Sequence, residues 1–260
     1  MNALRLSLIL ALSCVCAAQD VAPGADKIDG FGPAIFTSRS GEKLPYRLFI
    51  PASYDAKQKY PLILWLHGSG GLGDDNQLQI SQGNSFSTRL WTSDSVQKEH
   101  PSFVVAPQCP KGAAWTNGQS GEPSQYLEAV VRLLAELQKK YSIDSSRIYV
   151  AGQSMGGIGT WSLLAFHPEL FAAGIPVSSD FSPAKAKAIA TVPVWVFNGE
   201  NDPLFPVAKV RAMVEALRRE GGHVLYTEYP EAEHVIWDRV FAEPELPKWL
   251  FAQRRRSLAR

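Results

Sequence analysis

The chain has 260 residues, of which 45% are hydrophobic, and its formal net charge at neutral pH is +1. This length can bury a sizeable core, and this apolar fraction is that of a globular protein, which excludes wholesale disorder. Acidic and basic residues are interspersed along most of the chain, so it lacks the basic footprint of a nucleic-acid-binding protein. The arginines at 254–256 are typical of a solvated tail.

The first 18 residues have the pattern of a cleavable secretory signal. Arg5 precedes an apolar run over residues 6–15, which is too short to span a bilayer, and small residues at 16–18 suit a signal peptidase. We therefore expect a secreted or periplasmic protein, cleaved after Ala18 and without a membrane span in its mature form. Lipid attachment at one of the two cysteines in this segment is the alternative.

Loss of that segment would leave one cysteine, Cys109, so the mature chain cannot form an internal disulfide. The fold must then rest on its core alone. Cys109 lies in "APQCPKG", and no histidine-rich segment adjoins it, which favours a packed thiol over a nucleophile.

The predicted strands begin with a hairpin. The segments "GPAIFTSRS" and "LPYRLFIP" are β-rich and separated by residues 41–43, which predicts an antiparallel pair. Five short and almost unbroken apolar runs follow, as expected for strands buried on both faces of a parallel sheet. These runs cover residues 62–66, 103–106, 148–151, 172–177 and 192–197.

Helical spacing of apolar residues appears between these runs, at residues 126–137 and 210–217. Strands that alternate with helices predict an α/β fold with a mostly parallel, doubly wound sheet behind the antiparallel N-terminal hairpin. Since no repeat or low-complexity linker interrupts the pattern, we expect one domain over residues 19–260.

Two long segments, residues 68–97 and 107–125, are expected to be irregular loops. Long loops in compact domains are often functional, and these leave the carboxyl ends of strands, where ligands bind in open α/β sheets. They carry Trp91 and Trp115, which are candidate substrate-binding residues. The alternative is that both tryptophans fill local cores.

The stretch "IYVAGQSMGG" places a serine between glycines where a strand passes into a helix. Ser154 lies in a G-x-S-x-G motif, whose tight strand-to-helix turn exposes the hydroxyl of a nucleophile. The flanking glycines Gly152 and Gly156 leave room for that turn. The amide of Met155, at the start of the helix, is positioned to receive an oxyanion. Gln153, inside the motif, is a further candidate for substrate binding.

A serine hydroxyl needs a base, and in this context an acid and then a histidine follow it along the chain. His234 comes after the apparent strand "HVLYTEYP" and is favoured over His223, which opens that strand. Asp202 follows the strand "VPVWVFN" and is favoured as the acid, with Glu200 and Asp180 as the alternatives.

The segment "HGSGG" follows the run at 62–66 and is typical of a second oxyanion amide. Ser69 is the first choice for that amide and Gly68 the second, while His67 is expected to brace the loop. The polar residues at 74–76 are interpreted as a solvated loop rather than a cation site, and no metal or cofactor is expected.

The motifs together resemble those of the α/β-hydrolases. "HGSGGLGDDN", "VAPQCP", "GQSMGGIGTWSLLAFHPELFAA" and "VWVFNGENDPLFP" are similar to segments of secreted bacterial carboxylesterases of the phospholipase/carboxylesterase-like group, which is also catalogued as predicted peptidases and is related to feruloyl esterases. The resemblance implies an α/β-hydrolase fold and a small-molecule or polysaccharide-linked ester as substrate. It implies a carboxylesterase-type serine hydrolase with Ser154 as nucleophile, His234 as base and Asp202 as its orienter. A serine peptidase and a feruloyl or acetyl-sugar esterase are the alternatives.

Overall fold

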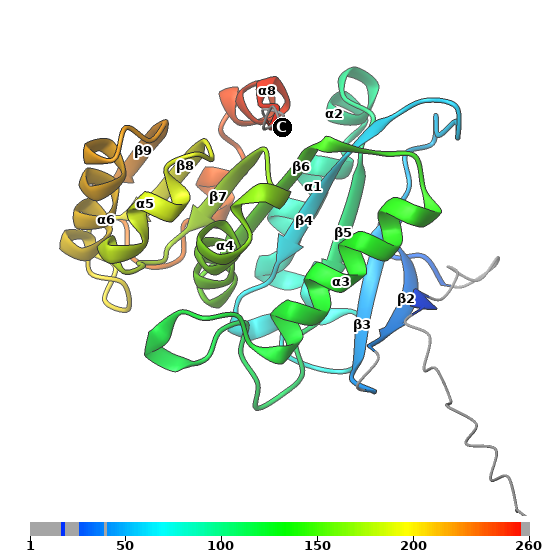
Figure 1. Cartoon of the computed structure of the whole chain (residues 1–260), viewed down its shortest axis with the longest axis horizontal. Helices are drawn as coiled ribbons and strands as arrows, with labels where there is room; N and C mark the ends of the chain where they lie inside the picture. Colours follow the sequence, from blue (N-terminus) through cyan, green and yellow to red (C-terminus); the bar gives the residue numbers. More distant parts are fainter. Residues whose placement is uncertain (1–16, 19–25, 39–40, 256–260) are drawn as a thin grey trace, which may run out of the picture.

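A central β-sheet organises the protein in a computed structural model that describes residues 17–18, 26–38 and 41–255 (Figure 1). The described strands form one nine-stranded sheet in the order β1-β2-β3-β5-β4-β6-β7-β8-β9. Their bounds are β1 Ala17–Ala18, β2 Gly32–Thr37, β3 Lys43–Phe49, β4 Tyr60–Leu66, β5 Phe103–Pro107, β6 Ile143–Gln153, β7 Ala173–Val177, β8 Val194–Gly199 and β9 Val224–Tyr229.

The pairing of the strands confirms the predicted fold class. β2 and β3 form the expected antiparallel hairpin, with Gly32 opposite Leu48 and Thr37 opposite Lys43, and β3 pairs antiparallel with β5. All pairs from β5 across to β9 are parallel. β4, β5, β7 and β8 are buried at every position, which explains why their sequences are unbroken apolar runs.

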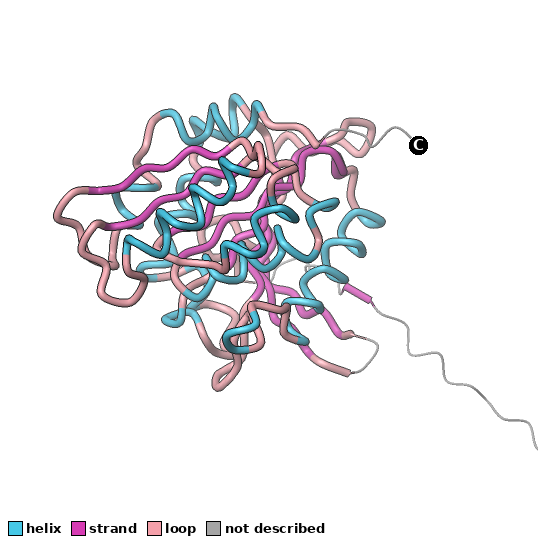
Figure 2. Tube along the Cα trace, turned by 60° about the vertical axis from the view of Figure 1, so that its left-hand side comes forward, coloured by secondary structure: helices cyan, strands magenta, loops and turns pink. Residues whose placement is uncertain are grey.

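Helices cover both faces of the sheet, and Figure 2 shows the layer of strands between them. One hydrophobic cluster lies beneath α3 (Gln125–Lys140), α4 (Met155–Phe166), α5 (Ala186–Ile189) and α6 (Val207–Arg219). A second cluster lies beneath α1 (Ser85–Thr92), α2 (Asp94–Glu99), α7 (Trp237–Val240) and α8 (Glu245–Ala252). Short 3-10 turns complete the described elements: η1 Ser69–Gly71, η2 Leu78–Ile80, η3 Gln82–Asn84, η4 Gly118–Ser120, η5 Pro168–Leu170 and η6 Pro183–Lys185.

The expectation that residues 68–97 form an irregular loop is wrong. This segment contains η1, η2, η3 and the helices α1 and α2. Serine and threonine supply three of the four residues that α1 buries, so its sequence, SFSTRLWT, shows no apolar period. Trp91 is the exception and anchors the helix. Between β5 and α3, residues 108–124 contain the short turn η4 and one bridge that pairs Thr116 with Pro123, and they are otherwise irregular, as expected.

The predicted secretory signal lies outside the described residues, apart from Ala17 and Ala18, which pair with Thr37 and Phe36 as β1. Export and cleavage after Ala18 stay a prediction. Among the described residues, none of the helices has the length and apolar character needed to cross a bilayer.

Candidate active site

Ser154 occupies a sharp turn between the last residue of β6 and the first residue of α4. Its backbone has φ 54° and ψ −120°, a left-handed conformation that side chains other than glycine rarely adopt. The turn is held at both ends, because the Ser154 N–H donates to the Val177 carbonyl (2.9 Å) and the Ile158 N–H donates to the Ser154 carbonyl (3.0 Å). A Cβ on Gly152 would overlap the Gly156 carbonyl, so the space for this turn depends on glycine.

Ser154, His234 and Asp202 form one hydrogen-bonded line. The Nε2 atom of His234 lies 3.0 Å from Ser154 Oγ, and its Nδ1 atom lies 2.8 Å from Asp202 Oδ2. The Asp202 side chain is fully buried, and its Oδ1 atom accepts from the amides of Leu204 (2.8 Å) and Phe205 (3.0 Å). Every oxygen of this carboxylate therefore has a partner, and the imidazole bridges it to the serine.

The His234 ring is fixed by contacts on several sides. Ser178 Oγ donates to the His234 carbonyl at 2.9 Å, which ties the histidine loop to the end of β7. The Phe205 ring stacks at 5.6 Å from the imidazole, and Trp237 meets it edge-on at 5.2 Å. These contacts leave the imidazole few orientations other than the one that faces Ser154.

The alternative acids and the alternative histidine are engaged elsewhere. Glu200 accepts from the Glu231 amide at 3.0 Å, and Asp180 lies 3.6 Å from Lys209 Nζ. His223 precedes β9, where its carbonyl accepts from the Val194 amide, so it lies at the end of the strand opposite His234. The geometry brings together the residues that were favoured from the sequence.

Two backbone amides are the candidates for an oxyanion hole at Ser154. Met155 is the first residue of α4 and Ser69 is the first residue of η1. The N–H groups at the start of a helix have no partner within that helix. The loop before η1 lies next to the serine, because a Cβ added to Gly68 would lie 3.5 Å from Ser154 Cβ. The Gly68 N–H donates to Asn84 Oδ1 at 3.2 Å. Gly68 is thus engaged, which favours Ser69 as the second oxyanion donor.

His67 holds the loop between β4 and η1 in place, as expected from the sequence. It is fully buried, its Nδ1 donates to the Gly68 carbonyl at 2.6 Å, and its Nε2 accepts from the Cys109 amide at 2.9 Å. Burial lowers the pKa of His67 to about 4, so the ring is neutral in the folded protein. Trp115 adds an indole N–H donated to the His67 carbonyl at 3.1 Å.

The buried imidazole should make the protein sensitive to acid. In the unfolded chain the His67 imidazole takes up a proton near its reference pKa of about 6.5. In the folded protein the same imidazole stays neutral down to about pH 4. The free energy of unfolding therefore decreases as the pH falls from about 6.5 to about 4, by about 3 kcal/mol in total. His67→Gln lacks this titration, so urea unfolding at pH 7 and pH 4 should show a smaller loss. Equal losses in the two proteins would contradict this assignment.

The three candidate substrate-binding residues are buried, which corrects that expectation. Trp91 lies in α1 with no exposed surface, and its indole N–H donates to Ser87 Oγ at 3.0 Å. Trp115 is likewise fully buried against His67. Gln153 is 4% exposed, and its Nε2 donates to the Gly83 carbonyl (3.3 Å) and to Asn84 Oδ1 (3.1 Å). Both tryptophans fill local cores, and Gln153 ties the end of β6 to η3.

Two further sequence interpretations concern a thiol and a polar loop. Cys109 is buried, and burial raises the pKa of its thiol to about 12, so the thiolate is disfavoured. Asp75 Oδ1 accepts from the amides of Gln77 and Leu78 and from Gln108 Nε2, so this carboxylate secures the loop. The described residues contain no group of three or more histidine, cysteine, aspartate or glutamate side chains suited to a metal.

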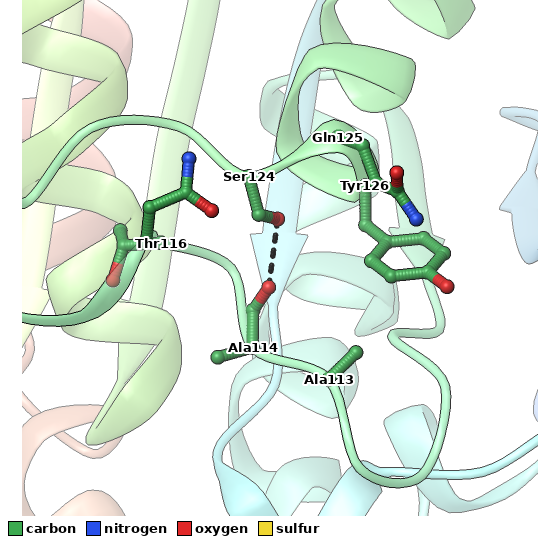
Figure 3. A pocket seen from close by; sticks show the side chains of 7 residues that line it. Ala113, Ala114, Thr116, Ser124, Gln125 and Tyr126 are labelled. Carbon is green, nitrogen blue, oxygen red and sulfur yellow. Dashed lines mark hydrogen bonds between the residues drawn. The ribbon is translucent and has the colours of Figure 1, made fainter.

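An open pocket of about 400 Å³ lies in the segment after β5 (Figure 3), and its lining includes none of the three residues of the hydrogen-bonded line. The Ser124 hydroxyl crosses it to the Ala114 carbonyl at 2.7 Å. The lining consists of small and polar side chains with one aromatic ring: Ala113, Ala114, Thr116, Asn117, Ser124, Gln125 and Tyr126.

Asn84, Ser178 and Phe205 were missed by reasoning from the sequence. Asn84 contacts residues 16 and 69 positions away, and Ser178 contacts a residue 56 positions away. Neither residue belongs to a local motif, so no sequence signal marks it. Phe205 comes three residues after Asp202 in the sequence, and this proximity was the one signal that could have placed Phe205 in the site.

Comparison with protein families gives a match over most of the chain. The family model described as "Putative esterase" matches residues 37–257. A bifunctional acetylxylan esterase/xylanase of Neocallimastix patriciarum is 27% identical over 158 residues, which cover 61% of this chain and 22% of that protein. A protein of Aspergillus niger named "Probable feruloyl esterase C" is 25% identical, with 76% of this chain and 68% of that protein covered.

Comparison with solved structures supports the same fold. A thermostable esterase superposes with a TM-score of 0.84 and 38% identity, over 88% of this chain and 64% of that one. The feruloyl esterase module from Clostridium thermocellum superposes with a TM-score of 0.65 and covers 96% of this chain and all of that module. At 18% identity this second likeness concerns the fold alone. The chain thus spans less than two thirds of the thermostable esterase and about a fifth of the acetylxylan esterase/xylanase.

Proposed function

The chain belongs to the esterase family and has an α/β-hydrolase fold, and from this premise we propose that it hydrolyses carboxylic esters through an acyl-enzyme on Ser154. The observation that carries the proposal is the hydrogen-bonded line from Asp202 through His234 to Ser154. Such a line activates a serine hydroxyl, which is a weak nucleophile without a base. The strained turn at Ser154 supports the same role, because it presents the hydroxyl away from the backbone.

Each residue of the site has one task in the proposed mechanism. His234 Nε2 accepts the Ser154 proton as the serine oxygen attacks the ester carbonyl carbon. Asp202 accepts the Nδ1 hydrogen bond and stabilises the imidazolium that forms. The amides of Met155 and Ser69 donate to the oxyanion. His234 then gives its proton to the departing alcohol, and a water molecule repeats the sequence on the acyl-enzyme to release the acid.

The surroundings of the histidine support a substrate with an apolar part. Phe205 and Trp237 flank the His234 ring, and two exposed aliphatic side chains adjoin the site in sequence. Leu204 is 64% exposed and Val235 is 67% exposed. An acyl chain or an aromatic acid ester would cover such surface, and feruloyl and acetylated polysaccharides are candidates by similarity to the feruloyl esterase and acetylxylan esterase relatives.

A panel of substrates tests the proposal and separates it from a peptidase. The panel contains p-nitrophenyl acetate, longer acyl esters, a feruloyl ester, an acetylated sugar and a peptide p-nitroanilide. We expect turnover of esters and none of the anilide above the level of the Ser154→Ala variant. Anilide turnover as fast as ester turnover would identify a peptidase, and ester turnover equal in Ser154→Ala would contradict the proposed mechanism.

A further inference from the structure

Asn84 joins the two loops that contribute to the proposed oxyanion hole. It is the last residue of η3 and is 4% exposed, and it lies in neither loop itself. We propose that Asn84 is a positioning residue that aims the Ser69 amide at the oxyanion formed on Ser154. This inference rests on the proposed function, because it concerns how that site is held.

The Asn84 side chain makes three hydrogen bonds to three different segments. Its Oδ1 atom accepts from the Gly68 N–H at 3.2 Å and from Gln153 Nε2 at 3.1 Å. Its Nδ2 atom donates to the Leu78 carbonyl at 3.0 Å. One buried acceptor thus ties the loop after β4 to the residue that immediately precedes Ser154. This shared oxygen therefore helps to set the separation of Gly68 and Gln153, the residues that precede Ser69 and Ser154.

The peptide that carries the Ser69 amide is held through its carbonyl, and the peptide before it is held through its N–H. The Gly68 carbonyl accepts from His67 Nδ1 at 2.6 Å and from the Gly71 amide at 2.9 Å. In a trans peptide the following N–H points opposite to this carbonyl, so the Ser69 N–H points away from those two donors. On the other side of Gly68, its own N–H is held by Asn84. Without Asn84 the peptide between Gly68 and Ser69 keeps its carbonyl contacts, but the preceding peptide loses the contact that fixes the Gly68 N–H and, through Gly68, the position of the Ser69 amide.

The alignment of such a donor matters most in the transition state. Loss of one oxyanion donor costs about 10²–10³-fold in kcat. A donor that is misaimed rather than removed should cost less, and we expect Asn84→Leu to lower kcat by about 10–100-fold with little change in KM. Leucine has nearly the same shape as asparagine but offers no acceptor to Gly68.

Substitution by aspartate separates the acceptor from the rest of the side chain. Asn84→Asp keeps oxygen acceptors for Gly68 and Gln153 but loses the donation to Leu78, which Asn84→Leu also loses. We therefore expect Asn84→Asp to retain more activity than Asn84→Leu. Asn84→Ala is the second variant if leucine prevents folding. Thermal unfolding of each variant shows whether it is folded at the assay temperature.

The readout that reports on the oxyanion is the ratio of kcat/KM for an ester to kcat/KM for its thionoester. Sulfur is a weak hydrogen-bond acceptor, so a well-aimed amide favours the oxygen compound. A misaimed Ser69 amide should lower this ratio in Asn84→Leu, whereas general loosening of the site lowers both rates together.

Asn198→Leu is a matched control, since Asn198 is a buried asparagine whose bonds go to the Gly199 and Phe205 carbonyls, beside Asp202.

The proposal expects a lower ester-to-thionoester ratio in Asn84→Leu and Asn84→Ala, with Asn84→Asp and Asn198→Leu close to the parent. An unchanged ratio in the folded leucine and alanine variants would overturn it. An equal fall in Asn84→Asp would assign the effect to the Leu78 contact and would also overturn it. The Ser154→Ala variant is assayed alongside, so that failure of the proposed function can be told apart from failure of the Asn84 proposal. Undiminished hydrolysis by Ser154→Ala contradicts the proposed function itself. If Ser154→Ala loses hydrolysis, the ester-to-thionoester ratio then tests the role of Asn84 alone.

Discussion

Replacing Ser154 by alanine should lower kcat for ester hydrolysis by about 10⁶-fold, the loss expected when the nucleophile of such a site is removed. The Oγ atom that lies 3.0 Å from His234 Nε2 is the only part of the side chain removed. Residual hydrolysis by the two amides, about 10³–10⁴-fold above water, should persist. The measurement is kcat with p-nitrophenyl acetate, on protein freed of contaminating esterases.

The control for this variant is a second serine of the same region. Ser178→Ala removes the bond from Ser178 Oγ to the His234 carbonyl, and it leaves the Ser154 hydroxyl in place. We expect it to lose far less activity, on the order of tenfold, because one neutral hydrogen bond is worth about 1 kcal/mol. If Ser154→Ala lost no more activity than Ser178→Ala, Ser154 would not be the nucleophile.

Asp202→Asn should lower kcat by about 10⁴-fold while the protein stays folded. The carboxylate oxygen 2.8 Å from His234 Nδ1 becomes either a carbonyl or an amide NH₂, and no charge remains to stabilise the imidazolium. Where the amide NH₂ faces Nδ1, the histidine proton moves to Nε2, and that nitrogen can no longer accept the serine proton. The pre-steady-state rate of p-nitrophenol release measures this loss directly.

Two neighbouring acids supply the controls for Asp202. Glu200→Gln and Asp180→Asn remove a carboxylate in the same way, but these side chains contact the Glu231 amide and Lys209 instead of the imidazole. We expect each to keep kcat within a few-fold of the parent, as surface contacts are worth about 1 kcal/mol or less. A large loss in either variant with an active Asp202→Asn protein would move the acid to that residue.

The parts of the site that could be predicted are those with local rules. The G-x-S-x-G spacing predicts the turn at Ser154, because a side chain on Gly152 would collide with the next helix. His234 and Asp202 could be chosen because each follows a strand whose carboxyl end must meet the same edge of the sheet. His67 could be interpreted as structural because the HGSGG segment is typical of an oxyanion loop, which leaves the histidine to brace that loop.

The parts that could not be predicted depend on contacts between distant segments. The tryptophans were expected on exposed loops, but Trp115 is covered by His67 and Trp91 packs near Phe251, which is 160 residues further along. The helix that contains Trp91 was missed because serine and threonine occupy most of its buried positions. Asn84 has no motif at all, and its importance follows only from the two loops that its one oxygen joins.

Labelling with a fluorophosphonate tests whether Ser154 forms the covalent intermediate. The reagent reacts with a serine that a neighbouring base activates, and peptide mapping by mass spectrometry identifies the modified residue. We expect one adduct per chain, on Ser154, with activity lost in proportion to labelling and no adduct in Ser154→Ala. An adduct on another residue that abolishes activity, or an active protein that the reagent leaves unmodified, would contradict it.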